Sequence, residues 1–260
     1  MQFIDYKIQT GKDNMQIDSD LLDAAIQNNY TEPVFRLYGW KPACVSLGRN
    51  QDNTFINQEI LKHYNIDCVR RLTGGRALLH DKELTYSYIS PISIIPNGDN
   101  VSESYKFISN IWIQIFKYLN IELSIGGAPR HITKNNYCMA VSTGADLCWK
   151  DKKIIGSAQC RKNGYILQHG SILLDYDKNK LETIFDEYTD FSTITTLKEI
   201  NPKLTLADVI NAAKSYLNKW FIPFTNIVKK CNVNKIKKSI LEDKKTLYKC
   251  KVSKNKFSLG

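Results

Sequence analysis

Long apolar runs are missing from this sequence of 260 residues. Its longest, such as Ile172-Leu173-Leu174, are far shorter than the roughly 20 residues that a membrane-spanning helix needs. The first residues, Met1 to Lys7, show no basic start followed by an apolar stretch, so the sequence predicts no secretory signal. We therefore expect a cytoplasmic protein that does not bind membranes.

Paired cysteines are missing as well. The seven cysteines include no CxxC pair, and their number is odd. That pattern fits neither a zinc cluster nor a disulfide framework, so the sequence predicts reduced thiols and no metal. Most should be core residues, with one or two in chemical roles. The thiols are Cys44, Cys68, Cys138, Cys148, Cys160, Cys231 and Cys250.

Excess charge is missing from most of the chain, although the net charge is +10. From Lys229 onward, eleven lysines face only Glu242 and Asp243, so this segment carries +9 and the remainder +1. The sequence therefore predicts a catalytic domain over residues 1–225 and a basic, partly helical tail over 226–260. Because the charge is confined to the tail, a nucleic-acid-binding function is disfavoured.

The spacing of apolar residues predicts helices mixed with hairpins. Helices are expected around residues 21–26, 57–64, 100–119 and 206–217, and strands at 34–40, 67–71 and 84–89. Residues 145–174 read as a three-stranded meander with turns at 150–152 and 162–164, where Asn163-Gly164 suits a tight hairpin. This mixture indicates an α+β fold.

Two segments concentrate residues with chemical potential. The first runs from Arg70 to Asp81 and contains Thr73-Gly74-Gly75-Arg76. Paired glycines let backbone N–H groups approach a ligand, and arginines donate to phosphate or carbonyl oxygens. The alternative is an ordinary turn with solvated arginines.

The second segment is Lys153-Ile154-Ile155-Gly156-Ser157-Ala158-Gln159, followed by Gln168 to Ile172. A lysine that opens a strand of small residues could reach into a pocket. The alternative is a surface lysine on a hairpin. His80 and His169 are candidates for acid–base chemistry or, alternatively, for structural hydrogen bonding.

Several common catalytic motifs are missing. The sequence has no GxxxxGK[ST] phosphate loop, no GxGxxG fingerprint, no HExxH helix and no GxSxG elbow. A cysteine thiol is therefore the best available nucleophile.

The two segments, in this order, resemble the lipoate-protein ligase and octanoyltransferase family, which is related in fold to biotin protein ligases. Arg70 to Ala77 with His80-Asp81 resembles the family's RRxTGGxA...HD loop, and Lys153 to Gln159 resembles its KixGsAq strand. Leu47 to Gln51 resembles its SLGRxQ strand end. The resemblance implies a mixed, largely antiparallel sheet with flanking helices.

Within the family, the positions of the thiols favour the cysteine-dependent octanoyltransferases of the LipM type. Their nucleophile stands eighteen residues before the motif glycine, and counting back from Gly156 gives Cys138. Arg76 also agrees, because many ligases have a third glycine there. The chain departs from the family at residues 141–145, where Val-Ser-Thr-Gly-Ala replaces an aromatic stretch. Cys148 and Cys160 are rival nucleophiles within predicted strands.

The resemblance implies an octanoyltransferase of lipoate biosynthesis that uses no cofactor. It would carry the octanoyl group from acyl carrier protein, through a Cys138 thioester, to a lysine of a lipoyl-domain protein such as the glycine cleavage H protein. Lys153 would hold the acyl carbonyl and favour the thiolate, and its loss should leave the core packed. The expected acyl- and substrate-binding residues are Arg71, Gly74, Gly75, Arg76, His80, Gly156, Ser157, Ala158, His169 and Gly170.

Two other enzymes remain alternatives. A lipoate-protein ligase would use ATP and magnesium and would not need Cys138. An amidotransferase would use a thiol but would move octanoyl between lipoyl domains, without acyl carrier protein.

Overall fold

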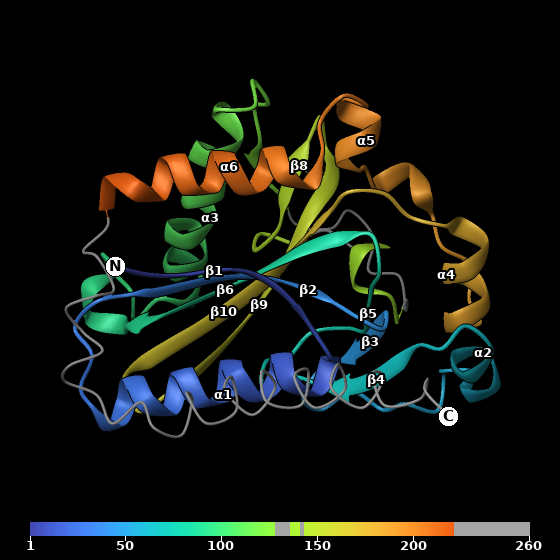
Figure 1. Cartoon of the computed structure of the whole chain (residues 1–260), viewed down its shortest axis with the longest axis horizontal. Helices are drawn as coiled ribbons and strands as arrows, with labels where there is room; N and C mark the ends of the chain where they lie inside the picture. The colour runs from blue at the N-terminus through green and yellow to red at the C-terminus, as the bar shows by residue number, and fades with distance from the viewer. Residues whose placement is uncertain (128–135, 141–142, 221–260) are drawn as a thin grey trace, which may run out of the picture. The chain divides into compact units, whose positions relative to one another are not determined.

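A computed structural model of the chain describes residues 1–127, 136–140 and 143–220. Its main sheet has seven strands, and Figure 1 shows them crossing the middle of the view. Only β1 and β2 pair in parallel, so the sheet is mixed and largely antiparallel, as predicted. In spatial order the strands are β1 (Gln2–Gln9), β2 (Val34–Trp40), β6 (Glu83–Pro91), β10 (Tyr165–Leu173), β9 (Lys152–Lys162), β8 (Leu147–Trp149) and β7 (Ser124–Ile125).

A second sheet of three strands holds the first motif. Its order is β4 (Asp67–Arg70), β3 (Cys44–Leu47), β5 (Leu78–His80), so residues 71–77 form the connection between its two outer strands. The helices α2 (Gln58–His63) and α4 (Lys178–Phe185) contribute Leu61 and Leu181 to the apolar cluster around this sheet.

Helices cover both faces of the main sheet because its strands alternate apolar residues between the two faces. On β2, Val34 belongs to the cluster of α1 (Gly11–Gln27), whereas its neighbour Phe35 belongs to that of α3 (Val101–Lys117) and α6 (Leu206–Leu217). Figure 1 shows α1 on one side of the sheet and α3 with α6 on the other.

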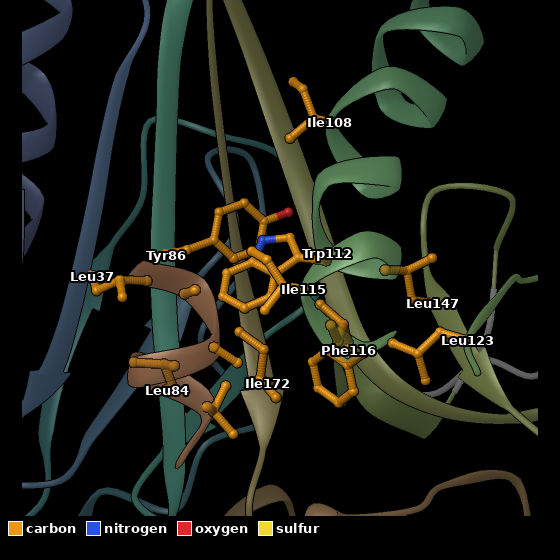
Figure 2. Packing of buried hydrophobic residues seen from close by; sticks show 14 of the residues in the cluster. Leu37, Leu84, Tyr86, Ile108, Trp112, Ile115, Phe116, Leu123, Leu147 and Ile172 are labelled. Atoms are coloured by element: carbon orange, nitrogen blue, oxygen red, sulfur yellow. The ribbon is translucent and has the colours of Figure 1, made fainter. Parts of the chain in front are cut away.

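The larger core is centred on Trp112 of α3 (Figure 2). Its ring centroid lies 5.0 Å from that of Tyr86 and 5.9 Å from that of Phe35. Ile115 and Phe116 follow on the same helix and are fully buried. This apolar face gives α3 its stability, because packing rather than propensity stabilises most helices.

Local signals in the sequence place several element ends correctly. The Asn100 side chain accepts hydrogen bonds from the Ser102 and Glu103 amides and begins α3. In the meander, Lys150-Asp151 and Asn163-Gly164 all have positive φ, the geometry of tight hairpins. The meander and the four predicted helices are confirmed.

Other elements lack a strong local pattern and were not predicted. Helix α1 starts ten residues before the predicted 21–26 segment, and β6 continues through Pro91. The unpredicted elements are β1, β5, β7, α4, α5 (Leu197–Ile200) and the 3-10 turns η1 (Ile92–Ile94), η2 (Cys138–Ala140), η3 (Phe191–Thr193) and η4 (Asn218–Trp220).

The predicted helical tail over 226–260 and residues 141–142 of the departure from the family lie outside the described residues. Within the described ranges, the helices are too short or too polar to cross a lipid bilayer.

Truncating Ile115 tests the core. We expect Ile115→Ala to lower the free energy of unfolding by about 2–5 kcal/mol, because it leaves a cavity in the α3 interface. Phe107→Ala, on the same helix but 38% exposed, should cost clearly less. Urea unfolding measures both, and equal losses would contradict the assigned packing.

Candidate active site

A cleft of about 370 Å³, including open solvent at its mouth, gathers most of the predicted site residues. Nine of the twelve line it, although they come from β5, β9, β10 and two loops. These nine are Arg71, Arg76, His80, Cys138, Gly156, Ser157, Ala158, His169 and Gly170. Its other walls are Met15, Tyr38, Trp40, Ser46, Leu78 and Ser171.

Two glycines of the cleft wall pack closely against side chains behind it. A Cβ on Gly156 would lie 3.0 Å from Met139 Sδ and 3.4 Å from Lys153 Nζ. A Cβ on Gly170 would lie 2.5 Å from a ring carbon of Tyr86. A side chain at Gly170 would therefore force Tyr86 to move, and one at Gly156 would press on Met139 and Lys153 behind the cleft wall.

Arg71 holds the glycine loop in place. Its guanidinium donates to the Ser46 backbone and hydroxyl oxygens at 2.7 Å each, and to the Gly74 and Arg76 carbonyls at 3.0 Å each. The remaining N–H faces Thr73 Oγ1 at 3.4 Å. All five donors of the side chain thus have partners, which makes Arg71 a clamp for the loop.

Gly74 and Gly75 lie in this loop rather than in the cleft wall. Gly75 has a φ of +90°, a conformation that favours glycine. Arg76 is half-buried in the cleft wall, and its guanidinium donates to no residue that the structure describes.

Cys138 begins the turn η2, which hydrogen bonds hold against the glycine loop. Its amide donates to the Ala77 carbonyl at 2.8 Å. The amides of Asn136 and Tyr137 donate to the Glu187 carboxylate at 2.8 and 3.0 Å. Cys138 itself is half-buried, and among the described thiols it alone lines the cleft.

The rival thiols are less suitable. Cys148 is buried in β8. Cys160 lies on β9 outside the cleft, and burial raises the pKa of its thiol.

Lys153 lies behind the cleft wall, 1% exposed, and is not the surface lysine of the alternative reading. Its Nζ donates to the Cys138 carbonyl at 2.8 Å and to Asp146 Oδ2 at 3.0 Å, and lies 3.9 Å from Cys138 Sγ. Burial alone would lower the pKa of Lys153, but Cys138 and Asp146 outweigh burial and raise it. Lys153 therefore stays an ammonium beside the sulfur.

Both predicted histidines are buried and hydrogen-bonded. His80 Nε2 lies 2.7 Å from Ser46 Oγ, and the ring stacks on Trp40 at 3.9 Å. His169 Nε2 lies 2.6 Å from Thr73 Oγ1. Burial is the main cause that lowers the pKa of each below the ordinary 6.5, so both rings are neutral at neutral pH.

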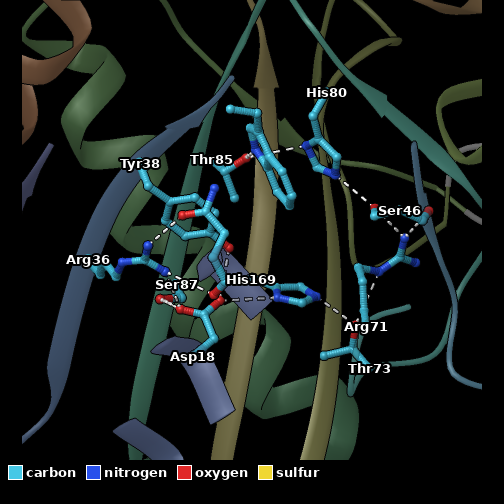
Figure 3. A network of polar contacts seen from close by, with 12 residues as sticks. Asp18, Arg36, Tyr38, Ser46, Arg71, Thr73, His80, Thr85, Ser87 and His169 are labelled. Carbon is cyan, nitrogen blue, oxygen red and sulfur yellow. Dashed lines mark hydrogen bonds and ion pairs between the residues drawn. The ribbon is translucent and has the colours of Figure 1, made fainter. Parts of the chain in front are cut away.

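A buried polar network supports the cleft from behind and was not predicted (Figure 3). Asp18 accepts hydrogen bonds from Arg36 and Tyr38 at 2.8 Å each and from Ser87 at 2.9 Å. Its Oδ2, which accepts from Tyr38, also lies 3.6 Å from His169 Nδ1, beyond an ordinary hydrogen bond. Asp18, Arg36 and Ser87 are far apart in the chain, so no local spacing could reveal this network.

Comparisons with known proteins identify relatives of this chain. A family model described as "Lipoyl protein ligase A/B catalytic domain" matches residues 10–218. Octanoyltransferase LipM of Clostridioides difficile is 37% identical over 179 residues, which are 67% of this chain and 66% of that protein. Octanoyltransferase LipM of Bacillus subtilis is 38% identical over 193 residues, 71% and 69% of the two chains. The matched part is thus about two thirds of each relative.

Solved structures share the fold. A lipoate-protein ligase A bound with ATP has a TM-score of 0.66 and 18% identity, with 84% of each chain covered. A bipartite lipoate protein ligase from Thermoplasma acidophilum has a TM-score of 0.62, with the same identity and coverage. These similarities confirm the predicted biotin/lipoate-ligase-like α+β fold.

Burial corrects the expectation that the core tolerates loss of Lys153. Lys153→Ala would leave the Asp146 carboxylate, 2% exposed, without its cation. We expect a loss of about 3–5 kcal/mol in the free energy of unfolding. Lys162→Ala removes an exposed pair with Asp23 from the same strand and should cost less than about 1 kcal/mol. Similar urea midpoints for the two variants would refute a structural role for Lys153.

The neutral histidines predict a pH dependence of stability. Because their folded pKa values lie below the unfolded values, unfolding takes up protons, and the free energy of unfolding should fall as pH decreases below about 6.5. A double variant, His80→Gln with His169→Gln, should show a weaker decline between pH 7 and 5. An unchanged slope in urea unfolding would mean that other groups cause the decline.

Proposed function

Because the chain belongs to the lipoyl protein ligase A/B catalytic domain family, we propose that it is an octanoyltransferase of lipoate biosynthesis. The names of its relatives support this activity and the acyltransferase class predicted from the sequence. We further propose acyl carrier protein as the donor and a lipoyl-domain protein, such as the glycine cleavage H protein, as the acceptor.

The observation that carries this function is the position of Cys138. The sulfur lies at a cleft with apolar walls from Met15, Trp40 and Leu78, and 3.9 Å from a buried ammonium. A thiolate is the nucleophilic form of cysteine. We propose that the alkyl chain lies along these walls, next to the sulfur.

In the first step, the Cys138 thiolate attacks the octanoyl thioester carbon of the donor. A new carbon–sulfur bond forms, the donor's carbon–sulfur bond breaks, and the departing thiolate takes a proton. Lys153 donates a hydrogen bond to the carbonyl oxygen, which carries the negative charge of the tetrahedral intermediate. One thioester replaces another, so the step is close to balanced in free energy.

In the second step, a neutral lysine amine of the acceptor attacks the thioester on Cys138. The carbon–nitrogen bond forms, the carbon–sulfur bond breaks, and the proton lost by the nitrogen goes to the released sulfur. An amide replaces a thioester, which makes this step favourable. Covalent catalysis thus divides one transfer into two easier ones.

The two alternative enzymes differ in what they need. A ligase needs ATP and proceeds without Cys138, whereas an amidotransferase accepts octanoyl from a lipoyl domain and ignores acyl carrier protein. Incubation of the protein with octanoyl carrier protein and an acceptor domain separates them. Octanoylation of the acceptor without ATP supports our proposal, and a strict requirement for ATP contradicts it.

Cys138 should carry the acyl group between the two steps. Intact mass spectrometry after exposure to octanoyl carrier protein should show one octanoyl adduct that is absent from Cys138→Ala. Cys68→Ala and Cys160→Ala remove thiols outside the cleft and should retain the adduct. If Cys138→Ala keeps the adduct and Cys160→Ala loses it, the nucleophile is Cys160.

A further inference from the structure

Asp146 and Cys138 together fix the direction of the Lys153 ammonium. An ammonium has three N–H donors. Asp146 Oδ2 lies 3.0 Å from Nζ, the Cys138 carbonyl lies at 2.8 Å, and the Cys138 sulfur lies at 3.9 Å. The ammonium thus contacts the Asp146 carboxylate and both the carbonyl and the sulfur of Cys138.

The Asp146 carboxylate is itself held rigidly. Its Oδ2 accepts from the Thr143 amide at 2.7 Å and from the Thr143 hydroxyl at 2.9 Å. Its Oδ1 faces the Ser157 amide at 3.4 Å. The carboxylate is 2% exposed, so it cannot turn away from Lys153 into water.

The proposed reaction changes the charge next to Lys153. Before acylation, the Cys138 thiolate can act as a second anion for the ammonium. After acylation the sulfur belongs to a neutral thioester, and a buried ammonium without an anion tends to lose its proton. A neutral amine would be a poorer donor to the carbonyl in the second step.

We propose that Asp146 is a positioning residue, the permanent counter-ion that keeps Lys153 charged and directed at the acyl group while Cys138 is a thioester. This inference rests on the proposed function and extends it to the second step. Asp146 touches neither the acyl group nor the sulfur in this scheme and acts through Lys153.

Among the described residues, thiols and tyrosines face this pair. Cys138 and Cys148 act on Lys153, and Tyr86 of β6 and Tyr105 of α3 act on Asp146. Burial raises the pKa of both tyrosines to about 12. The tyrosines therefore stay neutral up to pH 9.5. A pH dependence of stability or rate between pH 7 and 9.5 then reports on Lys153 and the thiols.

The first test needs no acyl chemistry. In a Cys138→Ser background, the Asp146 carboxylate still pairs with Lys153. Adding Asp146→Asn removes the charge but keeps an oxygen that can accept from Thr143 and Lys153. We expect the urea midpoint of this double variant, relative to Cys138→Ser, to rise from pH 7 to 9.5, because unfolding then takes up the proton that Lys153 lacks.

Adding Asp175→Asn instead removes a half-buried carboxylate that pairs with the exposed Lys82 and Lys198, and should leave that difference flat. A flat difference for Asp146→Asn as well would overturn the proposal. If the Asp146→Asn protein fails to fold, Lys153→Met is added to remove the unpaired cation. Recovery of folding supports the proposal, and failure to recover overturns it.

The second test separates the two steps in single-turnover experiments with native Cys138. Asp146→Asn should acylate from octanoyl carrier protein within a few-fold of the unmodified protein, but transfer to the lipoyl domain should slow about 10- to 100-fold. That loss should grow as pH rises toward 9.5, whereas Asp175→Asn should match the unmodified protein. Equal losses in both steps would mean that Asp146 only supports the fold.

The two tests fail in different ways. If the unmodified protein takes no octanoyl group, the proposed function is wrong. The unfolding experiment then still decides whether Asp146 keeps Lys153 charged.

Discussion

The buried ion pair between Lys153 and Asp146 is the interaction on which the site depends. It joins Lys153 on β9 to Asp146 in the loop before β8. Lys153 also donates to the carbonyl of Cys138, in the turn η2 that carries the thiol. A buried ion pair is costly to desolvate, and apolar replacements are often no less stable. We infer that the chemistry of a charged donor beside a sulfur, rather than stability, justifies this cost.

Arg71 plays the corresponding role on the opposite wall. Its hydrogen bonds fix the glycine loop, and its contacts with Ser46 and Thr73 place those hydroxyls against His80 and His169. Figure 3 shows these groups as one continuous chain that ends at Asp18 and Arg36. The two histidines, which were considered for acid–base roles, are parts of this framework in the folded protein.

The sequence predicts those features that depend on residues close together in the chain. Asn100 predicts the start of a helix, and Asn163-Gly164 predicts a hairpin turn. The two motifs predict the residues of the cleft through the family that they resemble. The sequence does not predict contacts between side chains that only the folded chain brings together. Asp146 lies in the loop before β8 and Lys153 on β9, and the Asp18 carboxylate meets His169 from a helix about 150 residues earlier. The burial of Lys153 was not predicted either, because a lysine at the start of a strand is equally consistent with the surface and the interior.

The central claim is that Cys138 carries the acyl chain while the Lys153 ammonium holds its carbonyl. A crystal structure of the protein trapped with octanoyl on its nucleophile tests this most directly. We predict a thioester on Cys138, with its carbonyl oxygen within hydrogen-bonding distance of Lys153 Nζ and its alkyl chain between Trp40 and Leu78. A chain bound elsewhere, or a carbonyl turned away from Lys153 toward solvent, would contradict it.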